Sequence, residues 1–522
     1  MIPISRFVIS IFASLVLFLL TACGGSSPSV TEMAPSVGEV SAAPVVTGTG
    51  TVTGTVTGTG TGTGTGTDIG RVADRCSPES ALYTLPCWTS YIGIVDDTEP
   101  PEWASWLRSW LGAITGYELV VDPGKVDTLK ERLATRLQKS DVMVPIPGYT
   151  KNAEKMAEYL DLIHSGGVAV WRDAVRSQVL GLGELDPTKS KVFYQLGNEI
   201  TVVAMSENIR SWGISHGLEV PGAAQEYDEA IIPFYVEYYL APTIAAASDA
   251  SLQVYGDRDT VQLVLGSIGD GGTPQAQAWL DSLLGYELKG DFAPSLQGKK
   301  VFELVDIISV HYIGTTGKIQ PIWDRWVGAG TITGLWTTEE IGHRSASSGE
   351  GAGRALRTVA NQLDWFYSQK ITPAQSRVAL YDWNLDGPNS NTSAGHALDT
   401  LYDFLGHSPL TTSVSEIVFT DSNFNLQQVQ LVPTRNPSLL ASVIWADDGS
   451  AAETINSISL ALPMIDQVVD VVVHYFSPLG HHVNAYTLDV ASGELHIDLV
   501  SPLAFGGRGH ALLVTIQPQK AL

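Results

Sequence analysis

Two apolar runs in this sequence each end on glutamate, at Glu199 and at the pair Glu339-Glu340. The run KVFYQL passes through a glycine directly into Asn198 and Glu199, and the run GLWTTEE closes with the pair. A carboxylic acid can donate a proton, and a carboxylate can accept one or attack as a nucleophile. Two such groups facing each other would therefore support acid/base and nucleophilic chemistry. Taken alone, Asn198-Glu199 could also be a polar loop start, and Glu199 could cap a helix.

Elements that would position these glutamates alternate along the middle of the chain. Continuous apolar runs, as expected for parallel strands covered on both faces, are each followed by helix-length segments. The runs are YIGIV (91–95), YELVV (117–121), DVMVPI (141–146), KVFYQL (191–196), VQLVLGSI (261–268), VDIISVHY (305–312), GLWTTE (334–339) and RVALYDW (377–383). The helical segments include 101–113, 126–139, 154–164, 225–247, 274–284, 355–368 and 394–406.

Eight such units predict an α/β fold, a (β/α)8 TIM barrel over 68–410. A doubly wound open sheet is the alternative, but no glycine-rich phosphate turn follows the first run. In a TIM barrel the active site lies at the carboxyl ends of the strands. The fourth and seventh strands are nearly diametric, so Glu199 and a glutamate of the seventh strand would straddle a bond. Cleavage of a glycosidic bond requires such a pair, one carboxyl as acid and the other as nucleophile or base.

The strand ends resemble those of the clan A retaining glycoside hydrolases over about residues 90–408. Gly-Asn-Glu ends the fourth run, His-Tyr the sixth, Trp-x-Thr-Glu the seventh and Trp the eighth. The nearest type is that of the β-xylosidases, α-iduronidases and exopolysaccharide hydrolases. The resemblance implies retaining hydrolysis of a poly- or oligosaccharide without metal or cofactor.

That resemblance also assigns roles to residues. Glu199 would be the general acid/base and Glu339 the nucleophile, with Glu340 as the alternative. The spacing from the tryptophan of WTTEE favours Glu339, and the following Ile-Gly favours Glu340. Substrate-binding roles fall to Asn198, His311, Tyr312 and Trp383, although His311 could instead be a buried structural histidine and Trp383 a core residue.

The amino terminus predicts export. Arg6 precedes an apolar run that ends in Leu-Thr-Ala-Cys at Cys23, and this resembles the lipobox of bacterial lipoproteins. Residues 1–23 are predicted to be a signal peptide with a lipidated Cys23, so that a membrane would be contacted through lipid, at the outer membrane if the cell is Gram-negative. A plain membrane span is the alternative, but the run is short for the roughly 20 residues required.

Residues 24–67 are rich in Thr and Gly and predict a flexible tether. Cys76 and Cys87 are the other two cysteines, and in an exported chain they predict one disulfide; two free thiols are the alternative.

Beyond 410 the helical pattern stops, and alternating runs predict a C-terminal β-sandwich over 411–522. His481-His482 in this part has no further ligand at metal-binding spacing, so no metal is expected. The formal net charge of −25 argues against nucleic acid as a partner. Two other functions remain open at this point: a non-catalytic glycan-binding lipoprotein and a structural envelope protein.

Overall fold

The structure of the protein is a computed structural model, which describes most of the chain beyond residue 85. The described residues are 86–95, 101–109, 123–146, 148–269, 271–340, 351–381, 393–417, 426–446, 453–462, 468–478, 480–490, 493–506 and 509–519. Every described residue belongs to one compact unit, Gly64–Leu522.

Parallel strands close into a barrel, which confirms the predicted α/β fold class. The strands are β1 (Ile92–Val95), β2 (Trp106–Arg108), β3 (Asp141–Ile146), β4 (Val192–Leu196), β5 (Gln262–Leu265) with its continuation β6 (Ile268–Gly269), β7 (Ile307–His311), β8 (Gly334–Glu340) and β9 (Val378–Tyr381). Their order is β5-β4-β3-β2-β1-β9-β8-β7-β6, and a pairing of β5 with β7 completes the ring.

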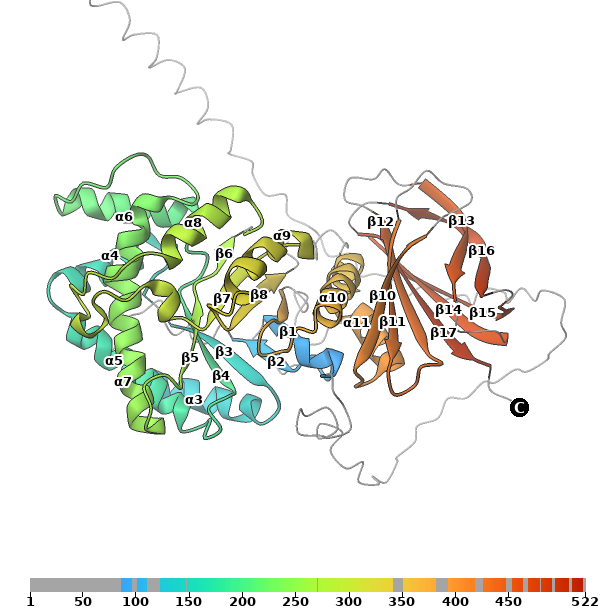
Figure 1. Cartoon of the computed structure of the whole chain (residues 1–522), viewed down its shortest axis with the longest axis horizontal. Coiled ribbons are helices and arrows are strands. Elements are labelled where there is room, and N and C mark those ends of the chain that lie inside the picture. The colour runs from blue at the N-terminus through green and yellow to red at the C-terminus, as the bar shows by residue number, and fades with distance from the viewer. Residues whose placement is uncertain are drawn as a thin grey trace, which may run out of the picture. The chain divides into compact units, whose positions relative to one another are not determined.

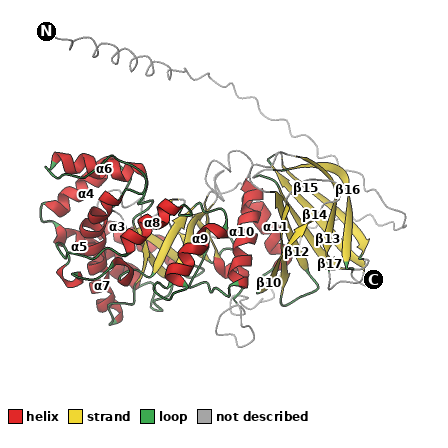
Figure 2. Cartoon of the chain, turned by 45° about the horizontal axis from the view of Figure 1, so that its top comes forward, coloured by secondary structure: helices red, strands yellow, loops and turns green. Residues whose placement is uncertain are grey.

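Helices lie around the parallel strands, as Figures 1 and 2 show. They are α3 (Pro123–Leu137), α4 (Ala153–His164), α5 (Val168–Gly183), α6 (Val203–Ser215), α7 (Ala241–Tyr255), α8 (Pro274–Leu284), α9 (Thr316–Ile322), α10 (Gly351–Ser368) and α11 (Ser393–Leu405), with the π-helical turn η4 (Phe234–Leu240) before α7. The start of α8 illustrates the local signals: Thr273 caps it by accepting from the Ala276 N–H, and Pro274 occupies its first position.

The barrel interior is filled by one apolar side chain from each strand. These are Val95, Trp106, Met143, Phe193, Val264, Ile307, Trp336 and Ala379. Gly93 leaves room for this layer, because a Cβ there would lie 2.5 Å from the Trp106 ring. Two positions further along four of the strands, on the same face, come Arg108, Gln195, Ser309 and Thr338, all buried. A polar layer therefore sits on the apolar one, toward the carboxyl ends of the strands.

The second strand is not where the sequence predicts it. The segment 101–113 was expected to be helical, yet it contains β2, which pairs in parallel with β1 and β3. Its apolar residues have helix-like spacing, but Trp106 is needed to fill the barrel interior, and tertiary packing overrides the local pattern. The run at 117–121, predicted as this strand, lies outside the described residues.

The C-terminal part is an antiparallel β-sandwich, as predicted. Its larger sheet has the order β10-β11-β12-β17-β14-β15, and β13 pairs with β16. The bounds are β10 (Leu410–Ile417), β11 (Leu426–Pro433), β12 (Leu440–Ala446), β13 (Glu453–Ala461), β14 (Val468–Ser477), β15 (Gly480–Asp489), β16 (Glu494–Phe505) and β17 (Ala511–Pro518). Alternate residues of β14, such as Val471 and Val473, pack with Ile458 and Ile497 of the smaller sheet in one core.

Several sequence predictions fall wholly or partly on residues outside the described part: the signal peptide with Cys23, the 24–67 tether, Cys76 and Trp383. Cys87 is buried and disulfide-bonded, and its pairing with Cys76 stays a prediction. Among the described residues, the helical stretch Glu229–Tyr255 is long and apolar enough to cross a membrane. Because 78% of its apolar window is buried within the protein, it has the character of a core helix.

Candidate active site

Glu199 and Glu339 meet at the carboxyl ends of the barrel strands. Glu199 follows β4, and Glu339 lies near the end of β8. One oxygen of each carboxylate and one ring nitrogen of His311 all lie within 4.8 Å of one another. Glu339 is 3% exposed and Glu199 remains partly open, so the pair combines one enclosed carboxylate with one that solvent can reach.

The turn that presents Glu199 uses left-handed backbone twice. Gly197 has φ +87° and Glu199 has φ +46°, a region that costs little for glycine but is unfavourable for glutamate. The Ile200 N–H donates to the Ser267 carbonyl at 3.0 Å, and the Tyr235 hydroxyl donates to the Leu196 carbonyl at 2.6 Å. These contacts hold the strained turn in place, as is common at functional sites.

Glu339, and not Glu340, faces Glu199 because β8 carries one extra residue. Val310 pairs with Thr337, but the next residue, His311, pairs with Glu339. If the side chains of β8 alternated strictly from the interior residue Trp336, Glu340 would point into the barrel. The extra residue interrupts this alternation, so Glu339 points inward instead. The Glu340 carboxylate instead accepts from the backbone N–H groups of Ile313 at 2.9 Å and Gly314 at 3.0 Å.

Three neighbours keep Glu339 ionised. Its Oε1 accepts from Arg108, its Oε2 accepts from the Tyr312 hydroxyl at 2.5 Å, and His311 Nδ1 lies 3.3 Å from Oε2. Burial by itself raises the pKa of this carboxyl, but His311, Arg108 and the Tyr312 hydrogen bond outweigh it, and the net pKa is lowered. The pKa of Tyr312 is strongly raised by burial and by Glu339, so its phenol stays a donor.

Arg108 organises this side of the site and was not foreseen from the sequence. Its side chain is fully buried. Its guanidinium donates from Nε to Gln195 Oε1 at 2.8 Å, from Nη2 to Asn198 Oδ1 at 2.7 Å, and from Nη1 to Glu339. A planar fork can serve three acceptors at once, which the single ammonium of lysine cannot do in the same geometry. A charged residue inside the apolar stretch WASWLRSW was the available clue.

Glu199 has a different environment, with the Lys151 ammonium at its open side. His311 and Lys151 lower the pKa of Glu199 to about 2, against the effect of burial, which raises it. His311 Nδ1 is 3.7 Å from Glu199 Oε1, too far for a good hydrogen bond, whereas Lys151 Nζ is 2.5 Å from Glu199 Oε2. Lys151, in the loop before α4, is a second residue that the sequence did not single out.

His311 stands between the two carboxylates on a support of buried hydroxyl groups. Its Nε2 lies 3.1 Å from Thr338 Oγ1, which contacts Ser309 Oγ at 2.5 Å. Ser267 Oγ joins Ser309 at 2.7 Å and accepts from Gln195 Nε2 at 2.6 Å. Hydroxyls both donate and accept, so this network fixes the imidazole while leaving its Nδ1 toward the carboxylates.

Glu199, His311 and Glu339 are close enough to hold a cation by geometry. However, Arg108 and Lys151 already place positive charge against the two carboxylates. A divalent ion would have to compete with both, so the donor set fits acid/base chemistry better than metal binding.

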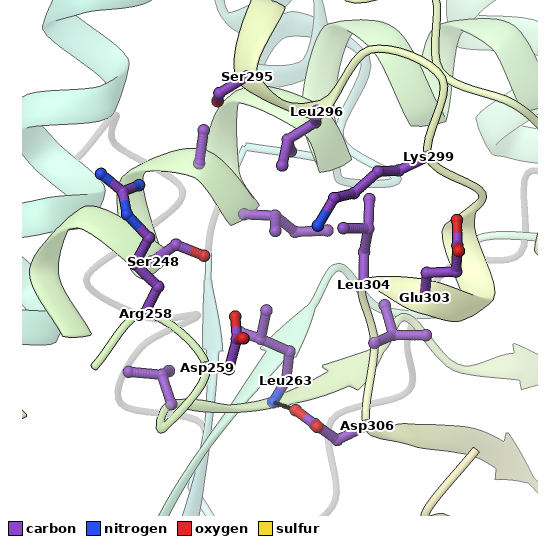
Figure 3. Close-up of a pocket in the computed structure, with 14 residues that line it drawn as sticks. Ser248, Arg258, Asp259, Leu263, Ser295, Leu296, Lys299, Glu303, Leu304 and Asp306 are labelled. Atoms are coloured by element: carbon purple, nitrogen blue, oxygen red, sulfur yellow. Dashed lines mark hydrogen bonds between the residues drawn. The ribbon is translucent and has the colours of Figure 1, made fainter. Parts of the chain in front are cut away.

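A separate cavity of about 230 Å³ lies at the other end of the barrel, where β5 and β7 begin (Figure 3). Its lining mixes apolar residues with five charged ones, Arg258, Asp259, Lys299, Glu303 and Asp306. Asp306 Oδ2 accepts from the Leu263 N–H at 2.7 Å, and burial raises the pKa of Asp306 to about 6. This end of a TIM barrel serves stability and does not carry catalysis.

No family model matches the sequence, and no curated protein does. Solved structures that are similar include a Paenibacillus polymyxa xyloglucanase of glycoside hydrolase family 44 (11% identity, 83% of this chain and 97% of that chain, TM-score 0.42). Another is a 4-O-α-L-rhamnosyl-β-D-glucuronidase from Fusarium oxysporum 12S (10% identity, 82% and 96%, TM-score 0.40). A third is a family 5 glycoside hydrolase from Bacteroides vulgatus (9% identity, 81% and 85%, TM-score 0.34). These are distant likenesses, so the side chains themselves have to carry the functional inference.

Proposed function

We propose that the protein is a retaining glycoside hydrolase that cleaves O-glycosidic bonds of a poly- or oligosaccharide. The observation that carries this proposal is the close pair Glu199 and Glu339 in unlike environments at the strand ends. Retaining enzymes place their carboxyl groups about 5–5.5 Å apart, whereas inverting enzymes leave about 6.5–9.5 Å for a water. A separation of at most 4.8 Å between one oxygen of each group supports the retaining mechanism.

In the proposed first step, Glu339 attacks the anomeric carbon while Glu199 protonates the departing glycosidic oxygen. Arg108 and Tyr312 support the nucleophile because they keep Glu339 ionised and fix the orientation of its carboxylate. In the second step Glu199, now ionised, takes a proton from a water molecule whose oxygen attacks the anomeric carbon. The ester bond between that carbon and Glu339 breaks, which releases the sugar and restores the Glu339 carboxylate. Asn198 would contact the sugar near the cleaved bond, held in place by Arg108.

Incubation with a panel of plant, algal and bacterial polysaccharides, followed by analysis of released reducing sugars, tests the activity. The wild-type protein should release oligosaccharides from at least one polymer. Glu199→Gln and Glu339→Gln should each lower the rate by at least about a thousandfold, since each removes an essential group. Glu158→Gln, at an exposed site on α4, is the control and should retain full activity. Full activity of both active-site variants would contradict the proposal.

A non-catalytic glycan-binding protein is the alternative. It would bind a polymer from the same panel without releasing products, in the wild type as in Glu339→Gln. The close pair of carboxylates favours the enzyme, because a binding protein gains little from two mutually repelling acids.

We also propose that the protein is exported and lipid-anchored at Cys23, with residues 24–67 as a tether. The support is the Leu-Thr-Ala-Cys motif after a short apolar run. Metabolic labelling with a palmitate analogue should mark the wild-type protein but not Cys23→Ser.

A further inference from the structure

The ion pair between Lys151 and Glu199 joins an exposed residue to the proposed acid/base. Lys151 Nζ lies 2.5 Å from Glu199 Oε2, and the lysine side chain is 51% exposed while that of Glu199 is 15% exposed. The backbone around the lysine is anchored: its carbonyl accepts from Asn208 of α6 at 3.0 Å, and the next residue, Asn152, caps α4. The Lys151 ammonium therefore lies at the open edge of the site, on a segment whose backbone is fixed by these two contacts.

This ion pair conflicts with the role that Glu199 has to play. A general acid must carry a proton when the glycosidic oxygen departs. His311 and the Lys151 ammonium, which lies at 2.5 Å, both favour the ionised carboxylate instead and hold the pKa of Glu199 at about 2. The resting arrangement therefore suits the second step, in which Glu199 is a base, but opposes the first. Something that arrives with the substrate has to draw the ammonium away.

We propose that an oxyanion on the substrate, the carboxylate of a uronic acid or a sulfate ester, engages Lys151 and so releases Glu199 to take up a proton from solvent. This inference rests on the proposed function and specifies its substrate class. An incoming oxyanion replaces the Glu199 carboxylate as the partner of the ammonium, so no charge is left unpaired. A neutral sugar offers no such exchange.

The acidity of the whole chain does not oppose this assignment. The net charge of −25 repels polyanions at long range, but exposed charges are screened beyond roughly 10 Å at 0.1 M salt. Recognition at the cleft is therefore decided by the groups in contact with the sugar. Lys151 is half-exposed there, and its side chain already binds a carboxylate.

A binding experiment tests the inference without relying on turnover. Glu339→Gln protein, with and without Lys151→Met, is titrated with oligomers of polygalacturonate, glucuronoxylan and κ-carrageenan. Each is paired with its carboxyl-reduced or desulfated counterpart, which separates carboxylate from sulfate recognition. At least one charged oligomer should bind about tenfold more tightly than its neutral counterpart, as expected for one charged hydrogen bond. Lys151→Met should remove that difference, and Lys155→Met, on the exposed face of α4, should not.

Equal binding of every charged and neutral pair, or a preference that survives Lys151→Met, would overturn the inference. Absence of binding by all six oligomers would overturn it as well. Failure of the proposed function gives a different result, since hydrolysis would then be absent in the wild-type protein while the binding preference could still be measured.

The pH dependence of hydrolysis gives a second readout that a merely structural lysine would not move. The basic limb of the kcat/KM profile reports the pKa of Glu199 in the free enzyme, and the basic limb of the kcat profile reports it in the substrate complex. In the wild type with an oxyanionic substrate, the basic limb of kcat should lie at a higher pH than that of kcat/KM. In Lys151→Met the kcat/KM limb should rise toward the kcat limb, and an unchanged gap would contradict the inference.

Discussion

Glu339 and Glu340 are adjacent in the chain, yet the described contacts of their carboxylates differ. Glu339 accepts from Arg108 and Tyr312 inside the barrel, whereas Glu340 accepts from two backbone N–H groups just after Tyr312. In the proposed mechanism Glu339 belongs to the reacting centre, whereas Glu340 fixes the loop that carries Tyr312. The extra residue in β8 is the reason why the two side chains have different contacts.

Glu340→Ala should lower stability more than it lowers catalysis. Two buried or half-buried N–H groups lose a charged acceptor, which costs about 1–3 kcal/mol in the free energy of unfolding. Thermal unfolding should show a clear drop in Tm. The value of kcat should fall only to the extent that the loosened loop displaces Tyr312. Complete loss of hydrolysis with an unchanged Tm would instead make Glu340 the nucleophile.

Tyr312→Phe should move the acid limb of the kcat/KM profile to higher pH. Glu339 must be ionised to attack, and the Tyr312 hydroxyl lowers its pKa. Without the hydroxyl the pKa of Glu339 rises, so activity is lost at a higher pH as the solution is acidified. The plateau should fall by roughly tenfold or more, the value of one charged hydrogen bond. An acid limb that does not move would show that Tyr312 does not tune the nucleophile.

Arg108→Lys should be far from conservative. The lysine keeps the charge but cannot donate at once to Gln195, Asn198 and Glu339. We expect kcat/KM to fall at least about a hundredfold, because a displaced nucleophile loses its attack geometry. Arg108→Met should also destabilise the fold by about 3–5 kcal/mol, since the buried Glu339 carboxylate would lose its arginine partner. Steady-state kinetics with Arg377→Lys, at an ion pair with Asp141 where β3 begins, provides the comparison. Equal kinetics of the two lysine variants would contradict the assignment.

The buried carboxyl of Asp306 should make part of the stability depend on pH. The pKa of Asp306 is about 6 in the folded protein and 3.8 in the unfolded chain. Between these two pH values the folded protein therefore binds more protons than the unfolded chain. Its contribution is fully present below about pH 4 and is lost as the pH rises through 6. Asp306→Asn, which still accepts from Leu263, should remove this dependence. The difference in unfolding free energy between wild type and variant should change by about 2 kcal/mol from pH 4 to pH 7. A constant difference would contradict the shifted pKa.

The sequence could predict the barrel and the positions of Glu199 and Glu339 because strand ends and their polar residues follow local patterns. It could not predict β2, since a strand of three residues gives no periodic pattern and its neighbours mimic a helix. Arg108 was missed together with that strand. The choice between Glu339 and Glu340 depended on an extra residue in β8, which only the pairing with β7 reveals. Lys151 was missed because its contact with Glu199 joins two loops.

Covalent labelling of the nucleophile tests the central claim most directly. The protein is incubated with the 2-deoxy-2-fluoro activated glycoside of the sugar that the polysaccharide digest identifies, and the labelled peptide is then mapped by mass spectrometry. The proposed retaining mechanism predicts one sugar per protein, attached through an ester to Glu339 and absent from Glu339→Gln. A label on Glu340, or active hydrolysis with no covalent adduct and inverted product stereochemistry, would contradict it.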